Sequence, residues 1–158
     1  MDSRLAFDKW THRFMKIAVE VSSWSKDPST KVGCVVVQGR TIVSTGYNGF
    51  PWTVNDEKFF ESSYTDNDRR KLTVHAEVNA CINMQNSSLL HNGLLTFYCT
   101  HKPCWDCLKY LSCFPGIYKV IYNKSVTSSG YDWNEGDLEE WLNSDIIMKW
   151  FEDYGKKE

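Results

Sequence analysis

The sequence lacks several features that would place it in other protein classes. Its 18 Lys and Arg are balanced by 20 Asp and Glu, and no dense basic run is present. This charge pattern argues against binding to long nucleic acid, although it leaves room for a local pocket that holds one phosphate. No apolar run reaches the length of a membrane-spanning helix, and the first residues form no apolar signal segment. We therefore expect a cytoplasmic protein that associates with neither a membrane nor a long nucleic acid.

The bulk composition is that of an ordinary globular protein. A chain of 158 residues with 42% hydrophobic and 24% charged residues suits one domain with a sizeable core. We expect a single domain over residues 1–158, with a loop insertion at 49–74. Aromatic residues are abundant, at 15% with seven Trp, and offer apolar surface for a homo-oligomer, which we expect to be a dimer or a hexamer.

Hydrophobic periodicity predicts the first elements. Apolar residues recur at spacings of four, three, four and three from Trp10 to Trp24, through Phe14, Ile17 and Val21, which predicts a helix over 5–24. A β-branched run predicts a strand at 32–37. After a short turn, a second strand follows at 41–47, and the two strands predict an antiparallel hairpin.

Strands and helices alternate in the rest of the chain. After a long loop at 49–71, with a helical turn expected near 56–62, the pattern predicts helices at 75–86, 104–113 and 137–143 and strands at 94–100, 118–122 and 146–151. The last strand could instead continue the preceding helix. Alternation of this kind indicates a three-layer α/β/α domain with a central five-stranded sheet.

Two short motifs carry the chemistry of the chain. The first is His75-Ala76-Glu77, and the second is Pro103-Cys104-Trp105-Asp106-Cys107. One His and two Cys can hold Zn²⁺ and leave its fourth position open for water. The composite pattern H-x-E…P-C-x-x-C is the signature of zinc-dependent nucleobase deaminases. The sequence therefore predicts zinc bound by His75, Cys104 and Cys107.

Other interpretations of the cysteines are weaker. Cys104 and Cys107 could form a redox pair or half of a structural zinc site. A structural site needs four protein ligands, and the chain has no second C-x-x-C and no H-x-x-x-H. The four other cysteines lie singly in apolar stretches, where a cysteine usually acts as a small buried hydrophobe.

Glu77 follows the zinc-binding His by two residues and is the candidate general acid and base. Zinc lowers the pKa of a bound water to roughly 7, which supplies hydroxide near neutral pH. A carboxylate beside that water can accept its proton, pass it to the ring and protonate the leaving ammonia. We also expect the metal-binding residues at the first turns of two helices, where the helix dipole favours thiolates.

Four stretches together closely resemble the deoxycytidylate (dCMP) deaminases of the cytidine and deoxycytidylate deaminase superfamily. They are Ser25 to Gly33, Gly46 to Pro51, Val74 to Ala80 and Pro103 to Cys107. The resemblance implies the cytidine-deaminase-like fold with a mixed sheet, and hydrolysis of dCMP to dUMP and ammonia. That reaction supplies the precursor of thymidylate.

The resemblance also assigns roles to individual residues. It implies zinc ligation by His75, Cys104 and Cys107, with Glu77 as acid and base. It implies substrate binding by Asn48, which would contact the deoxyribose, and by Ala76, and places Ser25 and Lys26 near the 5′-phosphate. Without the family, the sequence favours Asn48 as a turn residue between two glycines, and Lys26 is equally interpretable as a solvated charge.

Three departures from the family pattern stand out. Trp52-Thr53 follows the Gly-Tyr-Asn-Gly-x-Pro motif where many relatives have a small or basic residue and a glycine. Regulation by dCTP and dTTP through this loop is therefore an open question. Residues 49–74 contain no His or Cys, so we expect one zinc ion per chain and no second, structural zinc. The aromatic residue that reaches the phosphate after the fourth strand in relatives is missing, and Tyr131 or Trp133 is the candidate replacement.

Alternative functions follow from the same motifs. The substrate could be dCTP or deoxycytidine, because the phosphate contacts decide this choice. A base in tRNA or single-stranded DNA is a further option, although it would need stacking surfaces and basic channels. A nucleotide-binding module without catalysis is the remaining alternative, and the presence of Glu77 beside all three ligands argues against it.

Overall fold

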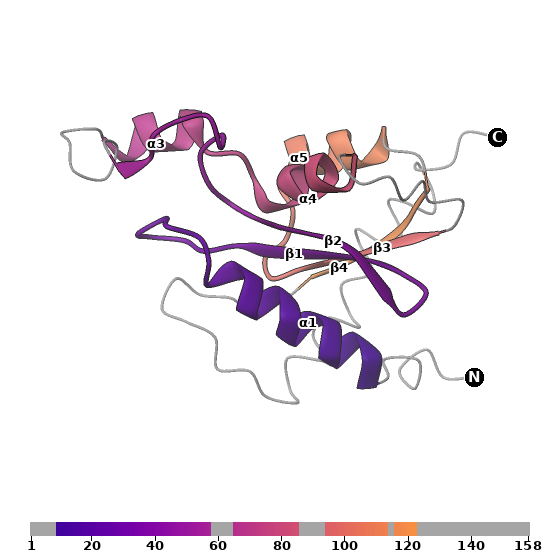
Figure 1. Ribbon diagram of the computed structural model, residues 1–158. Helices are drawn as coiled ribbons and strands as arrows, with labels where there is room; N and C mark the ends of the chain where they lie inside the picture. Colours follow the sequence, from indigo (N-terminus) through magenta and orange to yellow (C-terminus); the bar gives the residue numbers. More distant parts are fainter. Residues whose placement is uncertain (1–8, 58–64, 86–93, 114–115, 123–158) are drawn as a thin grey trace.

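The described part of the chain forms a sheet between two layers of helices (Figure 1). The computed structural model describes residues 9–57, 65–85, 94–113 and 116–122. Helix α1 (Lys9–Ser22) covers one face of the sheet, and α4 (Ala76–Gln85) and α5 (Trp105–Ser112) cover the other. This arrangement confirms the predicted three-layer α/β/α fold.

The sheet is mixed. Its strands in chain order are β1 (Gly33–Gln38), β2 (Thr41–Tyr47), β3 (Leu95–Cys99) and β4 (Ile117–Tyr122). The spatial order is β2-β1-β3-β4, with antiparallel pairs except for the parallel pair of β3 and β4, which α5 connects. The hairpin is therefore confirmed. The predicted helix at 137–143 and fifth strand at 146–151 lie outside the described residues, so the described sheet has four strands.

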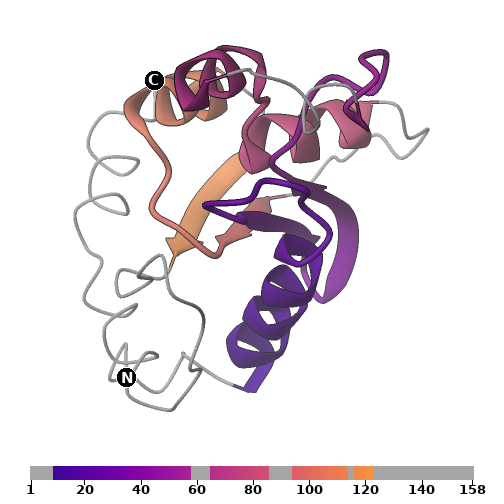
Figure 2. The ribbon, with the colours of Figure 1, turned by 90° about the vertical axis from the view of Figure 1, so that its left-hand side faces the viewer.

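Side chains alternate between the two faces of the sheet and form two cores. On β1, Cys34 and Val36 lie in the core beneath α4 and α5, whereas Val35 and Val37 lie in the core with α1. This alternation follows from the period of two along a strand. Figure 2, which views the sheet from its side, shows α1 and the pair of α4 and α5 on opposite faces.

The first helix ends two residues earlier than predicted, and its buried face is shifted. Phe14, Met15, Ala18 and Val21 are buried, while Ile17 is 37% exposed. The helix ends at Ser22, so Trp24 is no part of its stripe. Trp24 is half exposed and packs edge-on against Tyr47, with ring centroids 6.1 Å apart.

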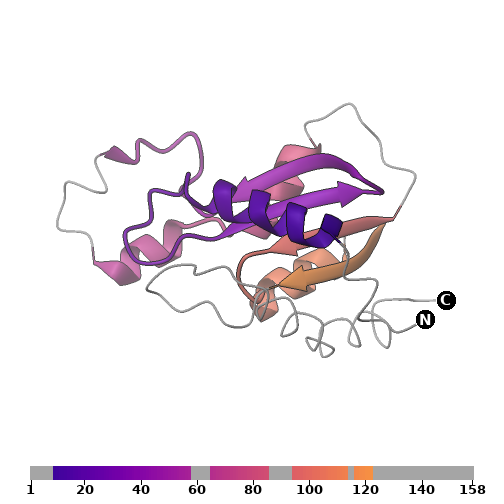
Figure 3. The ribbon, with the colours of Figure 1, turned by 90° about the horizontal axis from the view of Figure 1, so that it is seen from below.

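A short helix lies within the segment predicted to be a loop. Helix α3 (Asp66–Leu72) begins at a capping box, in which the Thr65 side chain accepts from the Asp68 amide and the Asp68 side chain accepts from the Thr65 amide. This S/T-x-x-D/E pattern was present in the sequence and predicts a helix start. The helix lies beyond one end of the sheet (Figure 3). Within the described residues, no helix has the length and apolar character needed to cross a bilayer.

Helix α4 approaches β2 very closely at Gly46. A Cβ built on Gly46 would lie 2.3 Å from the Ala76 carbonyl oxygen and 2.3 Å from the Ala80 amide nitrogen. Side chains hold the helix at this distance, because Asn79 Nδ2 donates to the Tyr47 carbonyl at 2.8 Å and Asn83 Nδ2 donates to the Thr45 carbonyl at 2.8 Å. The absence of a side chain at position 46 thus allows the first turns of α4 to pack directly on the backbone of β2.

We predict that Gly46→Ala destabilises the protein by about 1–3 kcal/mol or more, because the methyl group forces α4 away from β2. Urea unfolding measures the change. Gly49→Ala is the matched control, since the nearest atom to a Cβ there is a Tyr47 ring carbon at 4.0 Å. Equal stability of the two variants would show that the helix does not depend on this contact.

Candidate active site

The two motifs meet because each lies at the N-terminus of a helix. His75 directly precedes α4, and its carbonyl accepts from the Asn79 amide at 3.0 Å. Cys104 is the N-cap of α5, with extended backbone, and its sulfur accepts from the Cys107 amide at 3.4 Å. The unpaired amides of such first turns favour anionic thiolates, as predicted from the sequence.

The nitrogen of His75 lies at the spacing that zinc requires from both predicted sulfur ligands. His75 Nδ1 lies 3.2 Å from Cys107 Sγ and 3.5 Å from Cys104 Sγ, and all three atoms lie within 4.8 Å of one another. Ligands at about 2.0–2.3 Å from a tetrahedral ion are roughly 3.3–3.8 Å apart. One nitrogen and two sulfurs are also a donor set that zinc prefers. Among the described residues, this cluster fits a single zinc ion.

Glu77 lies against the cluster and away from bulk solvent. Glu77 is only 3% exposed, and Cys107 Sγ donates to its Oε2 at 3.5 Å. Burial raises the pKa of Glu77 above its ordinary value, although its own backbone amide and His75 oppose the shift. A raised pKa suits a group that must accept a proton and release it again near neutral pH.

Burial also raises the pKa of the Cys107 thiol, and the neighbouring Glu77 raises it further. A divalent cation reverses this preference, because a coordinating thiol is deprotonated. Without a cation, burial therefore favours the protonated forms of both Glu77 and Cys107. A bound cation would balance their charge, so that Cys107 could act as a ligand and Glu77 as a proton acceptor.

A cavity of about 370 Å³ opens onto the cluster. Its volume is within the range of roughly 300–1,000 Å³ that is typical of small-molecule sites. The walls come from the loop after α1, the end of β2, helix α3, the start of α4 and the loop before α5. They are formed by Asp27, Ser29, Thr30, Val32, Asn48, Arg70, Thr73, His75, Ala76, Glu77, His101, Lys102 and Cys104.

Asn48 lies in this wall as a buried clamp. Its Oδ1 accepts from the Val32 amide at 2.8 Å, and its Nδ2 donates to the Thr30 carbonyl at 2.8 Å. Its own carbonyl accepts from Ser25 Oγ at 2.7 Å. Asn48 therefore joins the end of β2 to the loop after α1. Contact between Asn48 or Ala76 and a substrate stays a prediction.

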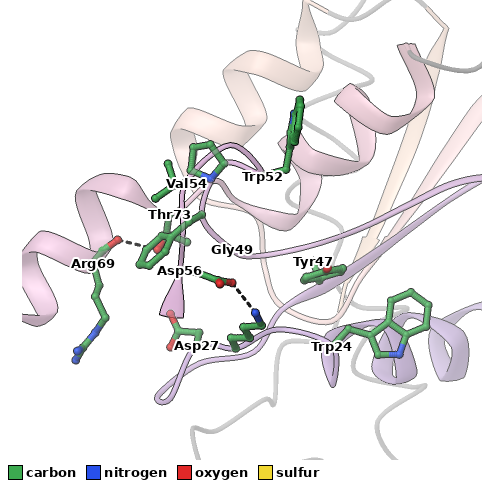
Figure 4. A pocket seen from close by; sticks show the side chains of 12 residues that line it. Trp24, Asp27, Tyr47, Gly49, Trp52, Val54, Asp56, Arg69 and Thr73 are labelled. Atoms are coloured by element: carbon green, nitrogen blue, oxygen red, sulfur yellow. Dashed lines mark hydrogen bonds and ion pairs between the residues drawn. The ribbon is translucent and has the colours of Figure 1, made fainter. Parts of the chain in front are cut away.

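The other predicted substrate residues lie elsewhere. Ser25 is buried and bonded to Asn48, and Lys26 forms an ion pair with Asp56 at 2.8 Å. Lys26 lines a second cavity of about 240 Å³, shown in Figure 4 with the dashed contact to Asp56. Trp52, which is 94% exposed, borders the same cavity. The structure does not bring Ser25 and Lys26 to the zinc cavity, and Tyr131 lies outside the described residues.

Among the cavity residues that sequence reasoning missed, three are basic, namely Arg70, His101 and Lys102. His101 and Lys102 directly precede the Pro103 motif, and Arg70 lies on the unpredicted helix α3. Their nearness to the motifs was a weak signal. That these side chains line the cavity depends on how α3 and the loop before α5 are packed in the fold, which no local sequence pattern encodes.

Comparison with known families agrees with this geometry. Residues 8–124 match the family model described as the cytidine and deoxycytidylate deaminase zinc-binding region. The chain belongs to this deaminase family. Its zinc-binding character therefore has independent support from the family and from the spacing of His75, Cys104 and Cys107.

The relatives and solved structures that this chain matches include proteins named as deoxycytidylate (dCMP) deaminases. A probable deoxycytidylate deaminase of Caenorhabditis elegans is 44% identical over 101 residues, which cover 63% of this chain and 50% of that protein. The apo structure of dCMP deaminase from cyanophage S-TIM5 is 32% identical, with a TM-score of 0.59 over 72% of this chain and 82% of that one. Its structure with dCMP and dUMP has a TM-score of 0.61 at 28% identity, over 84% of this chain and 88% of that one.

The matches to curated relatives cover only part of those proteins. They span 50%, 63% and 58% of the first three relatives. The likeness to the cyanophage enzyme, in contrast, covers most of both chains.

We predict that Cys104→Ser and Cys107→Ser each lose most of the zinc that the parent protein holds, because each removes a sulfur ligand. Zinc content after dialysis measures this directly. Cys113→Ser is the matched control, since Cys113 is exposed at the end of α5 and is not part of the cluster. Retention of zinc by both motif variants would contradict the assignment.

We further predict that Asn48→Ala lowers the free energy of unfolding by about 1–3 kcal/mol, because it leaves the Val32 amide and the Thr30 carbonyl without partners. Chemical unfolding is the measurement. Asn55→Ala should change stability little, since Asn55 bonds only to the exposed Glu57 amide at 3.2 Å. An Asn48 that served only to contact a sugar would leave stability unchanged.

Proposed function

We propose that this chain catalyses the hydrolytic deamination of dCMP to dUMP and ammonia. The observation that carries the proposal is the position of Glu77, buried against a His-Cys-Cys cluster at the end of a cavity of mononucleotide scale. The cavity suits a small molecule rather than a strand of nucleic acid. The relatives named deoxycytidylate deaminase support the choice of dCMP among cytosine compounds.

The residues of the chain divide the chemistry between them. His75, Cys104 and Cys107 would hold Zn²⁺, which when bound supplies activation of a water molecule as nucleophile. Glu77 is placed to accept one proton from the attacking water and to donate it to the ring nitrogen of cytosine. It would then take the second water proton, from the hydroxyl that the attack leaves on the ring carbon, and pass it to the amino group, which leaves as ammonia. The water oxygen becomes the carbonyl oxygen of dUMP, so atoms and protons balance.

The walls around Glu77 contribute positioning and exclusion of water. Asn48 holds the Thr30–Val32 segment in place through two side-chain hydrogen bonds. Ala76 is fully buried beside the carboxylate, between His75 and Glu77. A buried proton carrier of this kind exchanges its proton with the substrate more readily than with bulk solvent.

Several further properties belong to the same proposal. We propose one zinc ion per chain without a second, structural zinc, a single deaminase domain, and assembly into a homo-oligomer. Regulation by dCTP and dTTP is consistent with a separate cavity beside Trp52, although the Lys26–Asp56 pair already occupies part of its wall. The cytoplasmic location stays a prediction of the sequence.

We predict that Glu77→Gln lowers kcat on dCMP by about 10²–10⁴-fold while zinc content stays at the level of the parent, because glutamine cannot carry the proton. Ammonia release from dCMP, CMP, deoxycytidine and dCTP, each with and without dCTP and dTTP as effectors, measures activity and preference. An active Glu77→Gln variant would overturn the assigned role. A zinc-loaded parent that leaves dCMP unchanged would overturn the proposed substrate.

A further inference from the structure

Two cationic side chains face the zinc cavity without an ionic partner of their own. Arg70 on α3 and Lys102 in the loop before α5 both line the cavity and are exposed to solvent. Within the described ranges, neither side chain makes an ion pair or a hydrogen bond. Arg69, the residue before Arg70, pairs instead with Asp66.

The two cations approach the cavity from different elements. Arg70 lies five residues before the metal-binding His75, and Lys102 lies two residues before the metal-binding Cys104. Each is thus attached to a separate segment that leads into one of the two converging helices. A ligand held between them would contact both halves of the site.

The chemistry of the proposed reaction fixes the orientation of the substrate. The amino-bearing edge of cytosine must lie at Glu77 and the metal cluster, at the buried end of the cavity. The sugar and its 5′ substituent must therefore extend toward the open rim, where the long side chains of Arg70 and Lys102 are exposed. A phosphate at this rim is the natural partner for a guanidinium and an ammonium.

One acidic residue of the wall could oppose an anion, but its charge is already engaged. Asp27 Oδ1 accepts from the Ser29 amide, the Ser29 hydroxyl and the Thr30 amide, each at 2.9 Å. Although burial raises the pKa of Asp27, these hydrogen bonds and the nearby Arg69 lower it below its ordinary value. The Asp27 carboxylate is therefore occupied by hydrogen bonds within its own loop. Arg70 and Lys102 thus remain able to bind an anion at the rim.

We infer that Arg70 and Lys102 bind the 5′-phosphate of the substrate and give this chain its preference for a nucleoside monophosphate over the nucleoside. The inference rests on the proposed function for the orientation of the base. It assigns phosphate recognition to residues other than Ser25 and Lys26, which lie outside this cavity.

Binding of the product separates this inference from catalysis. Calorimetric titration of the zinc-loaded protein with dUMP and with deoxyuridine measures the contribution of the phosphate. We expect Arg70→Gln and Lys102→Gln each to raise the Kd for dUMP about tenfold or more, as loss of one charged hydrogen bond predicts. The Kd for deoxyuridine should stay within about twofold. In turnover, the same variants should raise KM for dCMP more than they lower kcat.

Lys71→Gln is the matched control, because Lys71 follows Arg70 on the same helix and does not line the cavity. It removes one positive charge and should leave dUMP binding unchanged. Zinc content of every variant shows that the cluster is intact. Lys102→Arg should restore part of the affinity that Lys102→Gln loses.

The outcomes are distinguishable. A parent protein that binds dUMP no more tightly than deoxyuridine would overturn the inference, as would zinc-loaded Arg70→Gln and Lys102→Gln variants that bind dUMP like the parent. An equal loss in Lys71→Gln would reduce the effect to general charge and also overturn it. A parent that binds dUMP through both cations but releases no ammonia from dCMP would leave the inference standing and overturn the proposed function.

Discussion

The contact between α4 and β2 at Gly46 is the constraint on which the site depends. At this point a helix backbone lies directly on a strand backbone, without room for a side chain. Ser44 Oγ donates to the Ala80 carbonyl at 2.7 Å, and Asn79 and Asn83 bond to β2 from the helix. These contacts fix the distance between the start of α4 and the sheet. That distance determines where His75 and Glu77 lie.

The second half of the site depends on the parallel connection from β3 to β4. Helix α5 begins after β3, so its first turn lies at the same edge of the sheet as the first turn of α4. Two backbone hydrogen bonds between Gly49 and Val74, with N···O distances of 3.1 and 2.7 Å, hold these segments together. The bridge joins the end of β2 to the segment just before His75. Two helix termini and one strand end are thus fixed to one another before any metal binds.

How far the sequence predicts the site depends on how local each feature is. The ligands and Glu77 follow from two short motifs at helix starts, and the structure brings them together as the motifs indicated. The bonds of Asn48 join residues 16 and 18 positions apart, and this pairing has no local pattern. Arg70 lies in a polar segment that predicts a loop, and the local sign of its helix is the capping box at Thr65.

The buried cysteines of the core differ in their surroundings from the candidate zinc cluster. Cys34, Cys81 and Cys99 are also fully buried, and burial raises the pKa of Cys81 to about 12 and that of Cys34 above its ordinary value. Among the described residues, these three thiols belong to no group of three potential metal ligands, and ionising a buried thiol is costly. Cys104 caps a helix and Cys107 lies in its first turn. We therefore expect Cys34, Cys81 and Cys99 to act as small core side chains, whereas Cys104 and Cys107 can reach one cation together with His75.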